Sequence, residues 1–368
     1  MIRILQVVNI MDRAGLETML MNYYRNIDRT KVQFDFLTHR IEKGAYEDEI
    51  ISMDGKVYHA PRLYPQNYKK YFGFMKAFFM EHPEYKIIHS HIDAMSYFPL
   101  QAAKNSGVPV RIAHSHSSKF DRDIKLPIKF IAQKNITKVA TINCACGEVA
   151  GRFMFHERPF KIVRNAVDIE KFKYDSIIRE RKRKELGIEN KFIVGHVGRY
   201  CYIKNQMFLI DVFNCVIKFK PNAHLLLVGK GENQKKIEEK IEKLGLKNKV
   251  TLLIDRSDVA ELYQAMDIFV MPSLFEGLPV VGIEAQASGM PCLVSNRISK
   301  ELLITSNIKM INLDKNKEEW AKEIMNTSIT RNGNARQELI DAGYDIVSEA
   351  EKLQRWYLNL YDTVSKEN

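Results

Sequence analysis

The chain of 368 residues is long enough for two domains, and a composition of 45% hydrophobic and 27% charged residues excludes a disordered or fibrous protein. Its formal net charge of +11 favours polyanions, anionic membrane surfaces or phosphorylated ligands as partners, without choosing among them. The five cysteines are an odd number and include no CxxC pair, so we expect neither a disulfide framework nor a zinc knuckle. This cysteine usage is typical of a protein in a reducing compartment.

No stretch of the chain approaches the ~18–20 consecutive apolar residues that a membrane-spanning helix needs. The start, Met-Ile-Arg, lacks the charged, apolar and small-residue regions of a signal peptide. We therefore expect a cytoplasmic protein that meets a membrane only peripherally, on the inner face of the cell membrane.

Short β-rich apolar runs alternate with segments of helical periodicity along most of the chain. In the first half the sequence predicts strands at Ile4–Val8, Gln33–Leu37, Lys86–His89, Val110–His114, Ala140–Asn143 and Lys161–Val163. Helical spacing between them includes Leu16–Ile27 and Ser96–Lys104.

The second half repeats this pattern. The predicted strands are Phe192–Val197, His224–Val228, Val250–Leu253, Ile268–Met271 and Pro291–Val294, and the predicted helices are Gln206–Phe219, Lys235–Leu244 and Val280–Ala287. Strand–helix–strand alternation predicts an α/β protein with two doubly wound parallel sheets.

We place the domain boundary in the weakly patterned region near residues 166–190. The prediction is an N-terminal Rossmann-like domain at 1–169, a C-terminal one at 170–345, and a terminal helix, 346–368, that packs back toward the N-terminal domain. The densest basic cluster, Arg179 to Lys184, is interpreted as a solvated helix face, with a polyanion site as the alternative.

Ligands of open parallel sheets lie at the carboxyl ends of strands. After the first strand, Gly15 permits close backbone approach, and the helix that follows offers unpaired N–H groups to an anion. Two histidine pairs, His89 with His91 and His114 with His116, follow later strands. They allow a metal site, structural hydrogen bonding, or a histidine facing the substrate, and the spacing alone leaves all three open.

In the second half, Gly198 and Arg199 follow a predicted strand, and Lys204 comes shortly after. Two cations beside a glycine turn suit a diphosphate, because arginine supplies a forked contact and lysine a point charge.

The strand Ile268–Met271 leads into a loop that carries Glu276 and then a helix that carries Glu284. With Pro279 near the first helical position, both acids can face one site beside a helix N-terminus that favours phosphate.

At these residues the sequence resembles a known family. FEGLPVVGIEA resembles the acid–seven–acid motif of retaining GT-B glycosyltransferases of the group 1 family (GT4), and GHVGRYCYIKNQ resembles their Gly-Arg…Lys diphosphate motif. IVRNAVDIEKF and DRAGLE resemble the family's Asn-Gly segment and its N-terminal Gly-Gly-x-Glu loop. The motifs occur in the family's order over almost the whole chain. Within the family, the sequence most resembles the exopolysaccharide and capsule transferases of Gram-positive gene clusters.

The resemblance implies two domains that face each other across a cleft, a nucleotide-sugar donor, most simply a UDP-sugar, and a lipid-linked or saccharide acceptor bound by the N-terminal domain. It implies a retaining hexosyl or N-acetylhexosaminyl transfer in which fixed cations stabilise the departing diphosphate, so no metal or other cofactor is expected. No covalent carboxylate nucleophile is evident, and front-side attack fits better.

The same resemblance assigns roles to individual residues. Arg199 and Lys204 would hold the diphosphate beside Gly198, and Glu284 would bind the ribose. Glu276, with the backbone of Gly277, Leu278 and Pro279, would hold the donor sugar. Gly15 would approach the distal phosphate, and His116, or His114 as the alternative, would contact the sugar, with Asn165 as a further candidate.

Two departures from the family pattern concern backbone geometry. Ala14 and Ala166 stand where the family has glycine. A left-handed backbone would cost alanine ~1–2 kcal/mol, so either the local turn differs or strain is tolerated there.

The basic and aromatic segment Tyr68 to Phe79 is interpreted as an amphipathic helix packed on its sheet, with contact to an anionic membrane as the alternative.

Three other functions are compatible with parts of the sequence. A GT-B nucleotide-sugar epimerase would share the fold but lack the acid–seven–acid string. A non-catalytic homologue that binds a sugar nucleotide would not need all four charged residues, Arg199, Lys204, Glu276 and Glu284, that this sequence keeps. A nucleic-acid-binding protein is suggested by charge alone, and no RNP-like or helix-turn-helix signature supports a nucleic-acid partner.

Overall fold

The computed structural model describes residues 1–120 and 124–366. They divide into two compact units, Met1–Ala166 with Ile346–Asn368 and Val167–Asp345. The second unit begins at Val167 rather than at residue 170, because Val167 forms a parallel bridge with Asp345 and helix α7 (Ile169–Phe172) contributes Ile169 and Phe172 to the C-terminal core.

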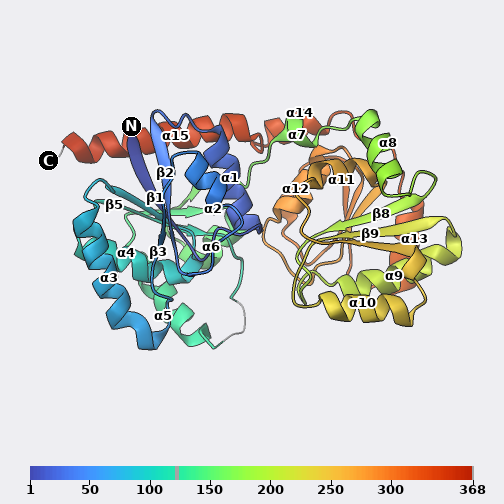
Figure 1. Cartoon of the computed structure of the whole chain (residues 1–368), viewed down its shortest axis with the longest axis horizontal. Helices are drawn as coiled ribbons and strands as arrows, with labels where there is room; N and C mark the ends of the chain where they lie inside the picture. Colours follow the sequence, from blue (N-terminus) through green and yellow to red (C-terminus); the bar gives the residue numbers. More distant parts are fainter. Residues whose placement is uncertain (121–123, 367–368) are drawn as a thin grey trace. The chain divides into compact units, whose positions relative to one another are not determined.

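Over its described residues the N-terminal unit contains a seven-stranded sheet of order β3-β2-β1-β4-β5-β6-β7, in which all neighbouring strands are parallel (Figure 1). The strands are β1 (Ile2–Val8), β2 (Val32–Thr38), β3 (Val57–His59), β4 (Ile87–Ser90), β5 (Val110–Ser115), β6 (Ile142–Ala145) and β7 (Lys161–Ile162). The helices are α1 (Gly15–Asn26), α2 (Glu47–Ser52), α3 (Tyr68–Glu81), α4 (Tyr97–Asn105), α5 (Leu126–Ile136), α6 (Glu148–Phe155) and α15 (Ile346–Lys366).

The C-terminal unit, described throughout residues 167–345, repeats the design with a six-stranded parallel sheet of order β10-β9-β8-β11-β12-β13. Its strands are β8 (Phe192–Val197), β9 (Ala223–Val228), β10 (Val250–Leu253), β11 (Ile268–Met271), β12 (Cys292–Ser295) and β13 (Ile308–Ile311). Besides α7, its helices are α8 (Ser176–Glu185), α9 (Gln206–Phe219), α10 (Gln234–Lys243), α11 (Val259–Ala265), α12 (Val280–Ala287), α13 (Lys317–Asn326) and α14 (Ala335–Asp341).

Both sheets have the strand order of a Rossmann fold, so the predicted fold class is confirmed. The central strands are buried along their whole length, which explains why their sequences read as continuous apolar runs. The sequence missed β3 and β13, which lie at the sheet edges and whose half-exposed residues give only a weak pattern.

Helix α15 belongs to the N-terminal unit although it follows the C-terminal unit in the chain. Ile346, Ala350, Leu353 and Tyr357 recur at helical spacing and join the core built by α1 and β2. The Tyr357 ring meets the ring of Phe34 edge-on, with 5.8 Å between centroids. In Figure 1 this terminal helix, drawn in red, lies along the unit that carries the N-terminus.

Helix α3 packs on its sheet through its aromatic residues. Tyr71, Phe78 and Phe79 are buried in the core of the N-terminal unit, which agrees with an amphipathic helix packed on its sheet. Contact of this helix with a membrane stays a prediction.

In α8 the interpretation as a solvated face is wrong for Arg183, which is buried and donates from Nη2 to Asp267 Oδ2 at 2.7 Å. Lys182 is also buried, with Nζ 2.7 Å from Asp258 Oδ2. The basic cluster therefore ties α8 to the segments that precede α11 and β11.

Among the described helices, none combines the length and apolarity that crossing a bilayer would require. All five cysteines are free thiols, as the spacing predicted.

Candidate functional site

The strand order of the C-terminal sheet reverses between β8 and β11, and ligands of such sheets bind outside the carboxyl ends at this switch point. The segment from Gly198 to Lys204 follows β8, and the segment from Ser273 to Pro279 follows β11. The backbone N–H of Leu274 donates to the carbonyl of Ile203 at 2.8 Å, which ties the two loops together. The fold thus brings both predicted donor-binding segments to one edge.

Lys204 and Glu276 meet directly at this edge. Lys204 Nζ lies 2.5 Å from Glu276 Oε1, with only 16% and 15% of the two side chains exposed. The Ser273 hydroxyl donates to the same carboxylate oxygen at 2.9 Å. A cation and a carboxylate predicted to act on one ligand are therefore neighbours.

Arg199 has a different partner. Its side chain is 69% exposed, and Nη2 donates to Glu232 Oε2 at 3.0 Å. The Arg199 carbonyl accepts from Gln206 Nε2 at 2.8 Å, so the backbone is anchored to the start of α9 while the guanidinium is solvated. Glu232, in the turn that follows β9, is a partner that the sequence pattern did not single out.

Glycines let the backbones crowd together at this edge. A Cβ on Gly229, whose φ is +152°, would lie 2.1 Å from the carbonyl oxygen of Gly198. A Cβ on Gly198 would lie 3.3 Å from His196 Nε2 and 3.4 Å from the Lys204 side chain. A larger residue at Gly229 would therefore displace the backbone of the cationic loop, whereas one at Gly198 would only tighten the packing against His196 and Lys204.

Glu284 lies on α12, whose N-cap is Pro279. The carboxyl is buried, and Tyr263 donates its hydroxyl to Oε2 at 3.1 Å. Burial raises the pKa of Glu284 to about 7, an effect that the hydrogen bond from Tyr263 and the charge of Lys171 only partly oppose. Gly277 is half-buried and the Leu278 side chain lies in the core, so the backbone of this turn is what a ligand would meet.

In the N-terminal unit, the two histidine pairs form one array at the carboxyl ends of β4 and β5. The His89 and His91 rings stack with centroids 4.2 Å apart, as do the His114 and His116 rings. His89 Nε2 lies 3.0 Å from His114 Nδ1, and His91 Nδ1 lies 3.0 Å from His116 Nε2. Burial lowers the pKa of His116 to about 3 and those of the other three rings well below the ordinary value, so all four are neutral at pH 7.

Two side chains from other elements fix the tautomers of these neutral rings. Gln6 Nε2 donates to the Tyr357 hydroxyl at 3.3 Å, and the Tyr357 oxygen lies 2.6 Å from His89 Nδ1. Because the buried phenol proton has a partner only when it is donated to this nitrogen, we assign the hydroxyl as the donor to His89. His89 Nε2–H therefore donates to His114 Nδ1, which leaves a proton on His114 Nε2. This nitrogen is buried and has no hydrogen-bond partner among the described residues.

The second row of the array runs through the same glutamine. His91 Nε2–H donates to Gln6 Oε1 at 2.8 Å, so His91 Nδ1 accepts from His116 Nε2–H. The network thus leaves His114 Nε2–H and the unprotonated Nδ1 of His116 outside these bonds. Either ring can offer hydrogen-bonding capacity to a ligand, and the contact of either ring with a sugar stays a prediction.

Ring nitrogens of His89, His91 and His114 lie within 4.8 Å of one another, so among the described groups these three could hold a metal ion. A metal would have to replace the His89–His114 hydrogen bond. The sequence missed this convergence because it depends on the pairing of β4 with β5. The intact hydrogen-bond network favours a structural role for these histidines.

Asp93 is a residue that sequence reasoning missed. Its buried carboxylate accepts from the backbone N–H groups of His116 at 2.7 Å and Ser117 at 3.2 Å, and from the Ser117 hydroxyl at 2.8 Å. Desolvation raises its pKa despite these bonds. A carboxylate two residues after His91 was the available signal, and its role is to fix the loop that carries His116.

Ala14 and Ala166, which stand where the family has glycine, do not adopt a left-handed backbone. Ala14 has an extended backbone with φ −129°, and Ala166 is not among the described non-glycine residues with positive φ. Alanine is therefore unstrained at both. Gly15 begins α1 with open space around it, and Asn165 is buried beside Ala166, whose carbonyl accepts from Asn22. Donor contacts by Gly15 and Asn165 stay predictions.

The family profile described as Glycosyl transferases group 1 matches residues 178–345. EpsF of Bacillus subtilis (strain 168), which carries a provisional glycosyltransferase name, is 35% identical over 309 residues, covering 82% of this chain and 80% of EpsF. The chain belongs to the group 1 family of glycosyltransferases.

Other relatives of this group 1 glycosyltransferase are more distant. The capsular polysaccharide biosynthesis glycosyltransferase CapH of Staphylococcus aureus is 26% identical over 320 residues, covering 84% of this chain and 82% of CapH. The UDP-Gal:alpha-D-GlcNAc-diphosphoundecaprenol alpha-1,3-galactosyltransferase of Escherichia coli is 26% identical over 296 residues, covering 75% and 76%.

Among solved structures, Anabaena HepE in complex with UDP and glucose matches with a TM-score of 0.81 at 19% identity, covering 97% of this chain and 99% of that chain. This likeness shows that the glycosyltransferase has the GT-B fold, as the resemblance implied.

Proposed function

We propose that this glycosyltransferase transfers the sugar of a UDP-sugar donor to a hydroxyl of a lipid-linked or saccharide acceptor during capsule or exopolysaccharide synthesis. The name of CapH supports the pathway. The donor is supported by the name of the Escherichia coli galactosyltransferase and by the UDP-glucose complex of HepE. A retained anomeric configuration and independence of metal ions belong to the proposal through the family resemblance.

The observation that carries the proposal is the contact of Lys204 with Glu276 at the switch point of the C-terminal sheet. Breaking a sugar–phosphate bond puts negative charge on the diphosphate and positive character on the sugar ring. A cation fixed beside the first and a carboxylate fixed beside the second stabilise both charges without reorganisation. Their mutual contact keeps the two groups next to each other at the carboxyl edge of the sheet, where one donor can reach both.

Arg199 would add a second cation to the diphosphate. Its present partner, Glu232, is an exposed carboxylate, and surface ion pairs of this kind are weak. The guanidinium can therefore exchange Glu232 for a phosphate at little cost and contact it through two N–H groups.

Glu284 is assigned to the ribose hydroxyls of the nucleotide. Its buried carboxyl keeps the hydrogen bond from Tyr263 and has a second oxygen to accept from a ribose hydroxyl. In the transfer itself the sugar–phosphate bond breaks, the acceptor oxygen bonds to the anomeric carbon on the same face, and the departing phosphate oxygen takes the acceptor proton. The chain's residues position and stabilise the groups, and none of them becomes covalently attached.

Turnover of UDP-sugars in EDTA tests this proposal. Lys204→Ala and Glu276→Gln are each expected to lower kcat by ~10²–10³, the usual effect of removing one preorganised charge-stabilising group. Lys309→Ala, which removes an exposed lysine paired with Glu323, is the matched control and should keep wild-type turnover.

The anomeric configuration of the product, read by NMR, tests retention in the same assay. Unchanged turnover in both Lys204→Ala and Glu276→Gln would refute the site. Activity that is lost in EDTA and restored by a divalent cation would refute metal independence.

A further inference from the structure

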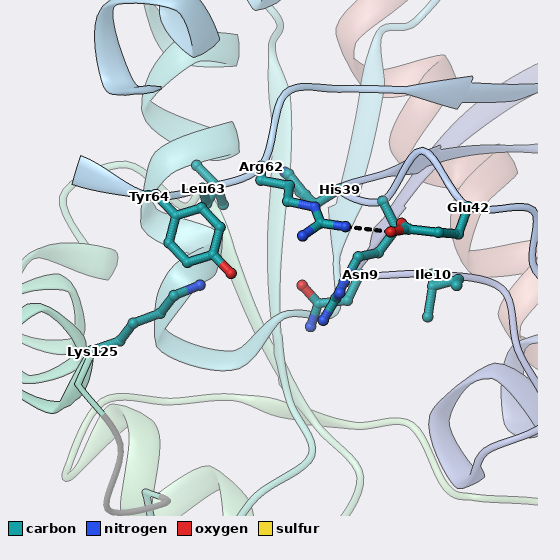
Figure 2. A pocket seen from close by; sticks show the side chains of 9 residues that line it. Asn9, Ile10, His39, Glu42, Arg62, Leu63, Tyr64 and Lys125 are labelled. Atoms are coloured by element: carbon teal, nitrogen blue, oxygen red, sulfur yellow. Dashed lines mark hydrogen bonds and ion pairs between the residues drawn. The ribbon is translucent and has the colours of Figure 1, made fainter. Parts of the chain in front are cut away.

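The N-terminal unit contains a cavity of about 490 Å³ that the donor assignment leaves unused (Figure 2). Its lining comes from one unit and consists of Asn9, Ile10, His39, Arg40, Glu42, Arg62, Leu63, Tyr64 and Lys125. Cavities of this size hold small-molecule ligands.

The position of the cavity is that of a ligand site. Asn9 directly follows β1, and His39 and Arg40 directly follow β2, so the cavity opens at the carboxyl edge of the sheet. The His39 backbone N–H donates to the Asn9 carbonyl at 3.0 Å, and His59 Nδ1 donates to the Arg40 carbonyl at 2.7 Å. The loop that carries Arg40 is therefore held in place from both sides.

The lining is cationic. Arg40, Arg62 and Lys125 face a single carboxylate, Glu42, so three positive charges minus one negative leave an excess of two. His39 adds no charge, because burial lowers its pKa to about 4.

His39 is instead part of the wall. Its Nδ1–H donates to the Val8 carbonyl at 2.9 Å, and its Nε2 accepts from the Tyr71 hydroxyl at 3.1 Å. Both ring nitrogens are therefore occupied, and any anion in the cavity would be bound by the arginines and the lysine.

The cationic side chains are positioned by their neighbours. Figure 2 shows Arg62 bonded to Glu42 on one side of the cavity and Lys125 beside Tyr64 on another. Lys125 Nζ lies 4.3 Å from the centre of the Tyr64 ring. Two arginine forks and a lysine point charge around one space suit the oxygens of a phosphate or diphosphate, and Leu63 and Ile10 leave apolar surface for the group that carries it.

We propose that this cavity binds the phosphate or diphosphate of a phosphorylated acceptor. The inference rests on the proposed function, which assigns the donor diphosphate to Arg199 and Lys204 in the other unit. The excess positive charge in the N-terminal unit then fits the second substrate. The same chemistry is presented by a lipid-linked glycosyl diphosphate and by a soluble glycosyl phosphate, and the experiment separates these sources.

Arg40→Ala, Lys125→Ala and the double variant test the cavity through acceptor kinetics at saturating donor. The acceptor probes are N-acetylglucosaminyl diphosphate on a short alkyl chain, N-acetylglucosamine 1-phosphate, and an alkyl N-acetylglucosaminide without phosphate. Removing one hydrogen-bonded cation should raise KM for the phosphorylated probes roughly tenfold or more. KM for the donor and for the probe without phosphate should not change.

Lys43→Ala is the matched control, because Lys43 lies on the same loop but pairs with Asp48 at 2.5 Å, and Lys43 does not line the cavity. A lower wild-type KM for the alkyl diphosphate than for the soluble phosphate assigns the lipid-linked source, and the reverse order assigns the soluble one. An unchanged KM for both phosphorylated probes in the double variant overturns the proposal.

A binding measurement separates failure of this inference from failure of the proposed function. Calorimetry with inorganic pyrophosphate, at saturating UDP to occupy the donor site, needs no turnover. Binding that is lost in the double variant but kept in Lys43→Ala supports the cavity even if no sugar is transferred. Equal pyrophosphate binding by wild type and the double variant overturns it, whatever the activity.

Discussion

At the scale of residues, two glutamates that follow the same strand occupy unlike environments. Glu276 contacts Lys204 and Ser273 and is partly exposed, whereas Glu284 is buried and accepts a hydrogen bond from Tyr263. The first environment stabilises a carboxylate through an ion pair. The second disfavours ionisation, and burial raises the pKa of Glu284 from 4.5 to about 7.

The raised pKa of Glu284 has a consequence for stability. The folded protein retains a proton on this carboxyl that the unfolded chain releases near pH 4.5, so stability falls as pH rises from about 4.5 to about 7. Glu284→Gln needs no ionisation and is expected to raise the free energy of unfolding by about 1–3 kcal/mol at pH 8. The gain should disappear near pH 4.5, and denaturant unfolding at the two pH values measures it. A gain of equal size at both would contradict the burial argument.

At the scale of elements, strands β4 and β5 and helix α15 meet in one polar network inside the N-terminal unit. The strands supply His89 and His114, and the residues directly after them supply His91 and His116. β1 supplies Gln6, and α15 supplies Tyr357. A single phenol from the last helix thereby sets the tautomer of His89 and, through it, the proton on His114. The helix thus orients the histidines at the carboxyl edge of this sheet as well as covering its core.

Tyr357→Phe tests this connection. The change removes the donor to His89 Nδ1 and the acceptor of Gln6 Nε2, and leaving buried polar groups unsatisfied costs about 1–3 kcal/mol. We expect that loss in the free energy of unfolding measured with urea.

Tyr361→Phe is the control for this prediction, because Tyr361 contributes its ring, with Lys86 Nζ 5.4 Å from the ring centre, and phenylalanine keeps that ring. Equal effects of the two substitutions would show that the Tyr357 hydroxyl bonds do not matter.

At the scale of the whole molecule, the N-terminal unit is built from two separate stretches of the chain, one before and one after the C-terminal unit. The chain completes residues 1–166, builds Val167–Asp345, and returns in α15 to finish the first unit. Ile346, Leu353 and Tyr357 then fill the N-terminal core, and each large apolar side chain buried in this way contributes about 1.5–3 kcal/mol. That sum is comparable to the stability of an entire domain.

Fragments of the chain test this dependence. Residues 167–345 alone should unfold cooperatively, whereas 1–166 alone should not, because it lacks α15. A fusion of 346–366 to residue 166 through a flexible glycine–serine linker should restore a cooperative transition to the N-terminal unit. Circular dichroism during heating measures all three, and cooperative unfolding of 1–166 alone would contradict the role assigned to α15.

The sequence by itself determined the fold class, and it predicted the two segments, after β8 and β11, that the fold brings to one edge of the sheet. Buried parallel strands are continuous apolar runs, and the residues after β8 and β11 stand out because glycine, cations and acids interrupt that pattern. Position after a strand is enough to predict which edge of a sheet a residue occupies, so Lys204 and Glu276 could be expected to be neighbours.

Tertiary structure decided what depends on partners distant in the chain. Arg183 was expected to be solvated because its own helix is polar, but Asp267, 84 residues later, buries it in an ion pair. From the sequence, the four histidines could bind a metal, form structural hydrogen bonds or face a substrate. Their hydrogen-bond partners depend on the pairing of β4 with β5 and on the hydroxyl of Tyr357, which lies 268 residues from His89 in the chain. Local pattern records which faces of an element are apolar, whereas charge state and hydrogen bonding are set by the groups that the fold brings next to them.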